Sequence, residues 1–157
     1  MKIAENSIIY PLPSDELIDK EEQCWKVKIP MDYRNFISKN NGCVPVENIF
    51  MFGEDKYVIE RFLCILANTR NHEMGMYDID VNLTKLDARL ISDEDLVGAE
   101  LVPITALFGG DFICLDYYED RDNPQIAIWY NEESEDLAPS TNTIANSFEE
   151  FLNMLFE

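Results

Sequence analysis

The chain has 157 residues, of which 46% are apolar, which is enough to bury a sizeable core and excludes a disordered acidic polypeptide. Its formal net charge is −19, from 31 acidic and 12 basic residues. Nucleic acids and anionic membranes bind proteins through basic surfaces, so this charge argues against both as partners.

No apolar stretch approaches the ~20 residues that span a bilayer, and the N-terminus lacks a signal-peptide pattern. The four cysteines are widely spaced, contain no Cys-x-x-Cys pair and lie in apolar surroundings, which indicates buried free thiols. We therefore expect one cytoplasmic domain over residues 1–157, without a disulfide framework.

The N-terminal part predicts two helices. Ser14 can cap a helix that reaches Trp25. Acidic residues in the first turn of that helix would stabilise it further, because they face the positive end of the helix dipole. Residues 27–29 read as extended before Pro30, which suits the first turn of a second helix. That helix is expected to end at Asn40-Asn41-Gly42, where glycine can adopt the left-handed conformation.

The middle of the chain predicts a hairpin, a helix and a short strand. Residues 49–52 and 57–66 read as strands around the turn Gly53-Glu54-Asp55-Lys56. Residues 78–90 have helical apolar spacing. Residues 101–104 form a short strand, which Pro103 should confine to a sheet edge or a strand entry.

The C-terminal part predicts two strands and a closing helix. Gly109-Gly110 should form a turn with positive φ before a strand at 111–116, and a second strand covers 126–130. Ser147 and Glu150 form a capping box that begins an amphipathic helix reaching residue 156. The order predicts an α+β domain with a mostly antiparallel sheet, N-terminal helices and a closing C-terminal helix.

Acidic residues dominate the last third of the chain. Residues 101–157 hold 12 acidic side chains and one basic side chain, Arg121. Most of the acids flank the strand at 126–130, so we expect two acidic loops that form one docking patch. The residues predicted to bind a partner are the acids Asp116, Glu119, Asp120, Asp122, Glu132, Glu133, Glu135 and Asp136 and the aromatic anchors Tyr117, Tyr118, Trp129 and Tyr130.

Blander readings of the same residues remain open. Acidity can serve solubility alone. Trp129 is more often a core residue than an exposed anchor.

Catalysis and cofactor binding find little support in the sequence. His72 is the only histidine, and no local signature pairs it with Cys64 or Cys114 as a nucleophile. The oxygen-rich segment 116–123 lacks the glycine and the spacing of an EF-hand loop. We expect no catalytic residue, no dedicated metal site and no cofactor. A carboxylate-based hydrolase remains a third reading, since 31 acids supply many carboxylate pairs.

Four segments, in this order, resemble the SUKH superfamily, which contains bacterial immunity proteins and the fungal Smi/Knr cell-wall regulators. The resemblance covers about residues 14–156. The segments are Ile29-Pro30-Met31-Asp32-Tyr33-Arg34-Asn35-Phe36-Ile37 with Asn41-Gly42; Leu101-Val102-Pro103-Ile104 with Gly109-Gly110-Asp111-Phe112-Ile113-Cys114-Leu115-Asp116; Ile126-Ala127-Ile128-Trp129-Tyr130-Asn131-Glu132; and Ala145-Asn146-Ser147-Phe148-Glu149-Glu150-Phe151-Leu152.

Two departures limit this resemblance. Many members carry Asp-His-Glu after the tryptophan, whereas this chain has Tyr130-Asn131-Glu132, so no role of that histidine transfers. The stretch from Arg70 to Leu101 matches no motif.

The resemblance implies a non-enzymatic protein that binds and neutralises a cognate toxin, often a nuclease. An acidic face would then occlude the toxin's basic surface. The alternative is an intracellular regulatory or scaffold protein like the fungal relatives.

Overall fold

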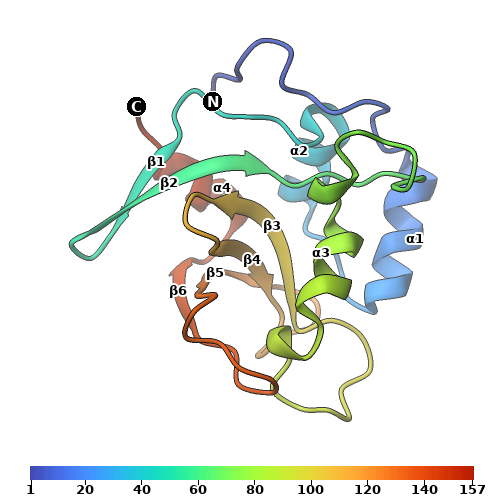
Figure 1. Cartoon of the computed structure of the whole chain (residues 1–157), viewed down its shortest axis with the longest axis vertical. Helices are drawn as coiled ribbons and strands as arrows, with labels where there is room; N and C mark the ends of the chain where they lie inside the picture. The colour runs from blue at the N-terminus through green and yellow to red at the C-terminus, as the bar shows by residue number, and fades with distance from the viewer.

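The computed structural model describes residues 1–157 and shows an α+β fold built on one six-stranded antiparallel sheet (Figure 1). The strands follow one another in chain order, each paired with the next. They are β1 (Ile49–Phe52), β2 (Asp55–Phe62), β3 (Leu101–Leu107), β4 (Phe112–Asp116), β5 (Gln125–Trp129) and β6 (Thr141–Ala145). The predicted fold class is confirmed, although sequence patterns did not identify β6.

Helix boundaries follow their caps. Helix α1 (Asp15–Trp25) begins where the Ser14 hydroxyl accepts a hydrogen bond from the backbone N–H of Leu17. Helix α2 (Met31–Asn40) begins one residue later than predicted, because Pro30 is extended and precedes the first turn. Gly42, which follows this helix, has φ of +66° and so adopts the predicted left-handed conformation.

The segment between α2 and β3 contains the first two strands and helix α3. The β1–β2 turn is shorter than predicted, since Asp55 and Lys56 already pair with Phe52 and Met51. Strand β2 ends at Phe62 rather than at residue 66. The chain then forms the 3₁₀ turn η1 (Gly75–Tyr77), helix α3 (Ile79–Leu86) capped by Asp78, and the 3₁₀ turn η2 (Asp87–Leu90). The helix predicted for 78–90 is present but ends at Leu86, because Asp87 has φ of +43°.

Pro103 lies in an interior strand rather than an edge strand, but at a position where that strand is paired on one side only. Strand β3 pairs with β4 along its length, but its recorded pairing with β2 is limited to residues 105–107, beyond the proline. The register shifts between Pro103 and Thr105, which marks an irregularity in the strand. Such a bulge is one of the positions where a sheet tolerates a residue without an N–H group.

The two faces of the sheet carry different cores because side chains alternate along each strand. The larger core contains Ile113, Leu115, Ile126 and Ile128. Aromatic side chains of α2 and α4 (Phe148–Asn153) join it, with Tyr33 and Phe148 packed edge to face at 5.1 Å. The smaller core, under α3 and η2, consists of Leu86, Leu90, Leu101, Cys114 and Trp129.

The chain ends lie beside the segment that leads into β1 (Figure 1). Ser147 caps α4 as predicted, but the helix ends at Asn153 instead of residue 156. Phe156 leaves the helix and forms an antiparallel bridge with Ile49. The backbone of Lys2 accepts a hydrogen bond from Val46 in the same region. No helix combines the length and apolarity needed to cross a membrane.

Candidate functional site: an acidic groove

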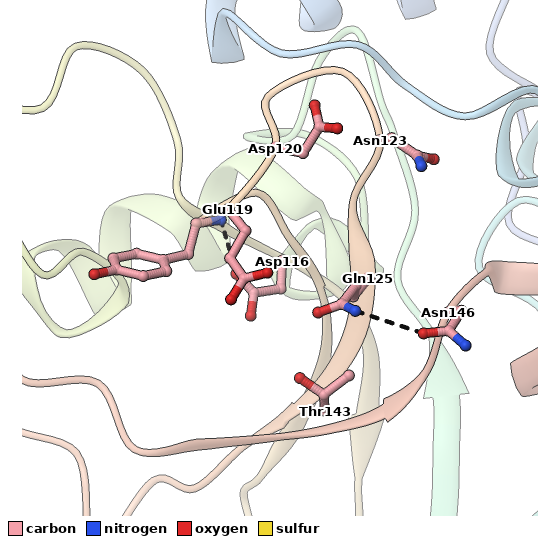
Figure 2. A pocket seen from close by; sticks show the side chains of 8 residues that line it. Asp116, Glu119, Asp120, Asn123, Gln125, Thr143 and Asn146 are labelled. Atoms are coloured by element: carbon pink, nitrogen blue, oxygen red, sulfur yellow. Dashed lines mark hydrogen bonds between the residues drawn. The ribbon is translucent and has the colours of Figure 1, made fainter.

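A depression of about 300 Å³ opens between the β4–β5 loop and β6 (Figure 2). We call it the acidic groove. Asp116 lies at the end of β4, Gln125 at the start of β5 and Thr143 on β6, so neighbouring strands form its floor. The complete lining is Asp116, Tyr118, Glu119, Asp120, Asn123, Gln125, Thr143 and Asn146.

The β4–β5 loop is held in shape by its own carboxylates. The Asp116 Oδ1 atom accepts a hydrogen bond of 2.9 Å from the backbone N–H of Tyr118, and Asp120 does the same for Asp122. Such side-chain turns fix a loop without regular backbone pairing. Across the groove, Gln125 donates to the Asn146 side-chain oxygen at 3.5 Å (Figure 2).

The Asp116 carboxyl is the half-buried centre of this site. Burial raises its pKa, the hydrogen bond from Tyr118 opposes that effect, and the negative charges of Glu100 and Glu119 raise it further. A cationic group that entered the groove would favour the charged form of Asp116.

Arg121 is the single basic residue of the last third, but it does not neutralise the groove. Its guanidinium donates to the backbone oxygens of Ala99, Lys26 and Val97, on the side of α1 and the 91–100 segment. No lysine or arginine lines the groove. The carboxylates of Asp116, Glu119 and Asp120 are therefore free of ion pairs, since the recorded salt bridges join only Arg34 to Asp15 and Asp19.

A second depression adjoins the first and shares Asp116 and Tyr118 with it. Its opposite wall is formed by Leu137, Ala138 and Pro139 of the β5–β6 loop. That loop begins at the far end of β5, and its returning arm comes back to the side of Tyr118. The β4–β5 loop and residues 137–139 of the β5–β6 loop therefore both lie near Tyr118, although the two loops leave β5 at opposite ends.

The structure separates the predicted partner-binding residues into three groups. Four of them line the groove: half-buried Asp116 and the exposed side chains of Tyr118, Glu119 and Asp120, with Tyr118 69% exposed. Asp122, Glu132, Glu133, Glu135 and Asp136 are exposed but line neither depression, and half-buried Tyr130 also lies outside both.

Two of the predicted aromatic anchors are core residues, which corrects the expectation for them. Tyr117 is completely buried and donates its hydroxyl to the Lys28 carbonyl at 2.7 Å. Trp129 is completely buried in the smaller core. Strand alternation explains Tyr117, because it continues the inward-facing row of Ile113 and Leu115.

Sequence reasoning missed four polar residues of the groove: Asn123, Gln125, Thr143 and Asn146. Gln125 could have been found, because it pairs directly with Asp116 once the β4–β5 hairpin is recognised. Thr143 and Asn146 required knowledge of β6. The segment 141–145, Thr-Asn-Thr-Ile-Ala, has a weak strand signal with two exposed polar residues at its centre.

The histidine and the three buried thiols lie outside the groove. His72 is bound through its ring nitrogens to the Tyr10 carbonyl and the Met74 backbone N–H. Burial raises the pKa of the Cys43 and Cys64 thiols to about 12 and that of Cys114 well above its usual value. No group of three or more His, Cys, Asp or Glu side chains is arranged to hold a metal ion.

Comparison with known proteins identifies the family. A SUKH family model with the description "SMI1-KNR4 cell-wall" matches residues 15–152, which is most of the chain. This protein belongs to the SUKH superfamily. The SPbeta prophage-derived uncharacterized protein YokK of Bacillus subtilis (strain 168) is 28% identical over 94% of this chain and 78% of its own length. No solved structure matches the chain.

The family assignment confirms the resemblance carried by the four sequence segments. In this SUKH protein, the second and third of those segments contribute β3, β4 and β5. They therefore supply three of the six strands of the sheet, with Asp116 as the last residue of the second segment.

Proposed function

We propose that this protein is a non-enzymatic immunity protein that binds and neutralises a cognate toxin inside the cell that produces both. The observation that carries the proposal is the acidic groove, with three carboxylates, an exposed tyrosine and no basic residue. Membership of the SUKH superfamily supports the same role. The three buried thiols and the engaged histidine give no support to a Cys–His nucleophile.

The toxin that best fits this groove is a nuclease with a basic active surface. A nuclease holds phosphates with lysine and arginine side chains, and carboxylates can occupy the same positions. Asp116, Glu119 and Asp120 would supply the negative charge, and Tyr118 would supply the apolar contact. Binding then prevents substrate from entering, without any chemical step by this protein.

Charge and aromatic contact contribute differently to such a complex. Opposite fields raise association rates toward ~10⁸–10⁹ M⁻¹s⁻¹ at low salt, against ~10⁵–10⁶ for neutral surfaces. Buried aromatic contacts more often slow dissociation. The acidic groove should therefore govern capture, and Tyr118 should govern how long the complex lasts.

Co-expression with the C-terminal domain of a toxin encoded beside this gene tests the proposal. The groove variant E119K/D120K should bind at least about tenfold more slowly at low salt, with a weaker salt dependence. The matched control is E54K/D55K, which makes the same change in charge at the exposed tip of the β1–β2 hairpin. A third variant, E132K/E133K, measures the contribution of the β5–β6 loop.

Equal association rates for the groove variant and the hairpin control would remove the groove from the interface. A loss confined to E132K/E133K would move the interface to the β5–β6 loop. If the neighbouring toxin neither binds the wild-type protein nor becomes harmless in its presence, the immunity role itself is wrong. The regulatory role of the fungal relatives would then be favoured.

A further inference from the structure

A third depression, which shares no lining residue with the acidic groove, lies between α1 and α3. We call it the α1–α3 pocket. It encloses about 560 Å³ and combines acidic side chains with an apolar wall. Glu21 comes from α1 and Asp80 from α3, while Leu17, Leu66 and Val81 supply apolar surface. The space can hold a charged group together with a hydrocarbon stem.

Glu21 is the unusual residue of this pocket. Its side chain is only 6% exposed, and its Oε2 atom is buried without a hydrogen-bond partner. Buried carboxyl oxygens are ordinarily satisfied, because removing one from water without a partner is costly. Its hydrogen-bonding contact is with another carboxyl group, that of Asp80, so the two carboxyls must share a proton or bind a cation.

The charges around Glu21 are mostly negative. Asp78, the N-cap of α3, and Asp80 lie near it, and Lys20 on α1 is the one basic residue that lines the pocket. Neither Glu21 nor Asp80 forms an ion pair with any basic residue of the chain. One Asp80 oxygen accepts a hydrogen bond of 2.8 Å from the Trp25 indole, and both Asp78 oxygens accept backbone N–H groups, of Leu66 and Val81.

We propose that the α1–α3 pocket binds a guanidinium group, with Glu21 and Asp80 as its two acceptors. A guanidinium presents several N–H donors in one plane, so it can satisfy carboxyl oxygens on two helices at once. It is weakly hydrated, which suits a partly apolar pocket better than a strongly hydrated ammonium. Metal ions fit less well, because calcium takes six to eight oxygen ligands and no three-residue ligand cluster exists here.

Proton release accompanies this binding. Burial raises the pKa of Glu21 to about 8, and hydrogen-bonding contact and charge repulsion from Asp80 add to the effect. The empty pocket therefore holds Glu21 protonated at neutral pH, and a cation must displace that proton. The apparent affinity should fall about tenfold for each pH unit below 8.

The two tryptophans allow a direct test by NMR on ¹⁵N-labelled protein. The Trp25 indole N–H touches Asp80, whereas the Trp129 indole donates to the Arg89 carbonyl and serves as an internal control. Ethylguanidinium chloride should shift the Trp25 signal saturably and leave the Trp129 signal in place. Ethylammonium chloride, magnesium chloride and sodium chloride at equal ionic strength should produce much smaller shifts.

Glu21→Gln is the decisive variant, because it resembles the protonated side chain and should preserve the fold. It should abolish the saturable shift and its pH dependence, whereas Glu16→Gln, an exposed change on the same helix, should alter neither. Equal binding by Glu21→Gln, or an affinity in the wild type that does not change between pH 6 and pH 9, would overturn the proposal. So would an equal response to magnesium.

Acetyl-arginine amide separates two sources of the guanidinium group. Tighter binding than ethylguanidinium would assign the pocket to an arginine side chain of a protein partner, and weaker binding would assign it to a free small guanidinium compound. This inference does not rest on the proposed toxin. Its failure would leave the acidic groove and its test unchanged.

Discussion

Arg89 and Trp129 are joined twice in this structure. The Trp129 indole donates a hydrogen bond of 2.9 Å to the Arg89 carbonyl, and the Arg89 guanidinium lies 5.0 Å above the same ring. That guanidinium also donates to the backbone oxygens of Asn131 and Ser134. One arginine of η2 therefore anchors the acidic β5–β6 loop to the sheet.

Replacing Arg89 with alanine should destabilise the protein by about 2–4 kcal/mol, because it removes charge-assisted hydrogen bonds and a cation–π contact together. Urea unfolding measures the effect. Lys85→Ala, an exposed change on α3, should stay within about 0.5 kcal/mol of the wild type. A stable Arg89→Ala protein with unchanged hydrogen exchange in the 130–140 loop would contradict the anchoring role.

Replacing Asn41 should destabilise the protein as much as replacing Arg89. Its buried amide donates to the carbonyls of Ile9 and Ile65 and accepts from the Ile65 N–H at 2.8 Å, so it joins three segments of the chain. Asn41→Ala leaves those buried groups unpaired, and we expect a loss of about 2–4 kcal/mol in the free energy of unfolding. The control is Asn35→Ala, at an exposed position of α2. Equal midpoints of denaturation for the two variants would show that these bonds contribute little.

Glu21 should make stability depend on pH. Its folded-state pKa of about 8 lies above the usual value of 4.5, so the folded protein binds more protons than the unfolded chain between these values. This contribution to stability is complete below pH 4.5 and is lost as the pH rises through 8. The difference in unfolding free energy between wild type and Glu21→Gln should therefore change across this window. A constant difference would show that Glu21 titrates normally.

The four thiols should differ sharply in reactivity. Cys24 is exposed, while Cys43, Cys64 and Cys114 are buried with raised pKa values. Because the thiolate is the reactive form, Ellman's reagent should modify one thiol quickly in the native protein and all four in guanidinium chloride. In Cys24→Ser the rapid phase should disappear. Fast modification of a second thiol would mean that the core opens readily.

Local features of the chain were predictable where a few neighbouring residues decide the outcome. Ser14 and Ser147 each cap a helix with the hydrogen bond expected from their positions, and Gly109 and Gly110 take positive φ. The motif segments were sufficient to indicate the family. The ends of helices and strands were predicted less well. Helix α4 ends early because Phe156 pairs with Ile49, which is more than one hundred positions away in the chain.

The candidate site was predictable only in part. Asp116, Glu119, Asp120 and Tyr118 lie around one groove, since they are close in sequence and share a loop. Gln125 joins them through the β4–β5 pairing, whereas Thr143 and Asn146 join them through β6, which the sequence patterns did not reveal. The acids of the β5–β6 loop line neither depression, so the single docking patch expected from both loops stays a prediction. The buried state of Trp129 depends on η2, which belongs to the stretch without any motif.

The sequence alone determined the sign of the surface charge, the caps, most of the secondary structure and the family resemblance. These properties depend on composition or on contacts over a few residues. The tertiary structure decided which aromatic rings are buried, how Pro103 fits inside a sheet, which polar groups surround Asp116 and why Glu21 lacks a partner. Each of these depends on packing between segments far apart in the chain, and local preferences do not specify such packing.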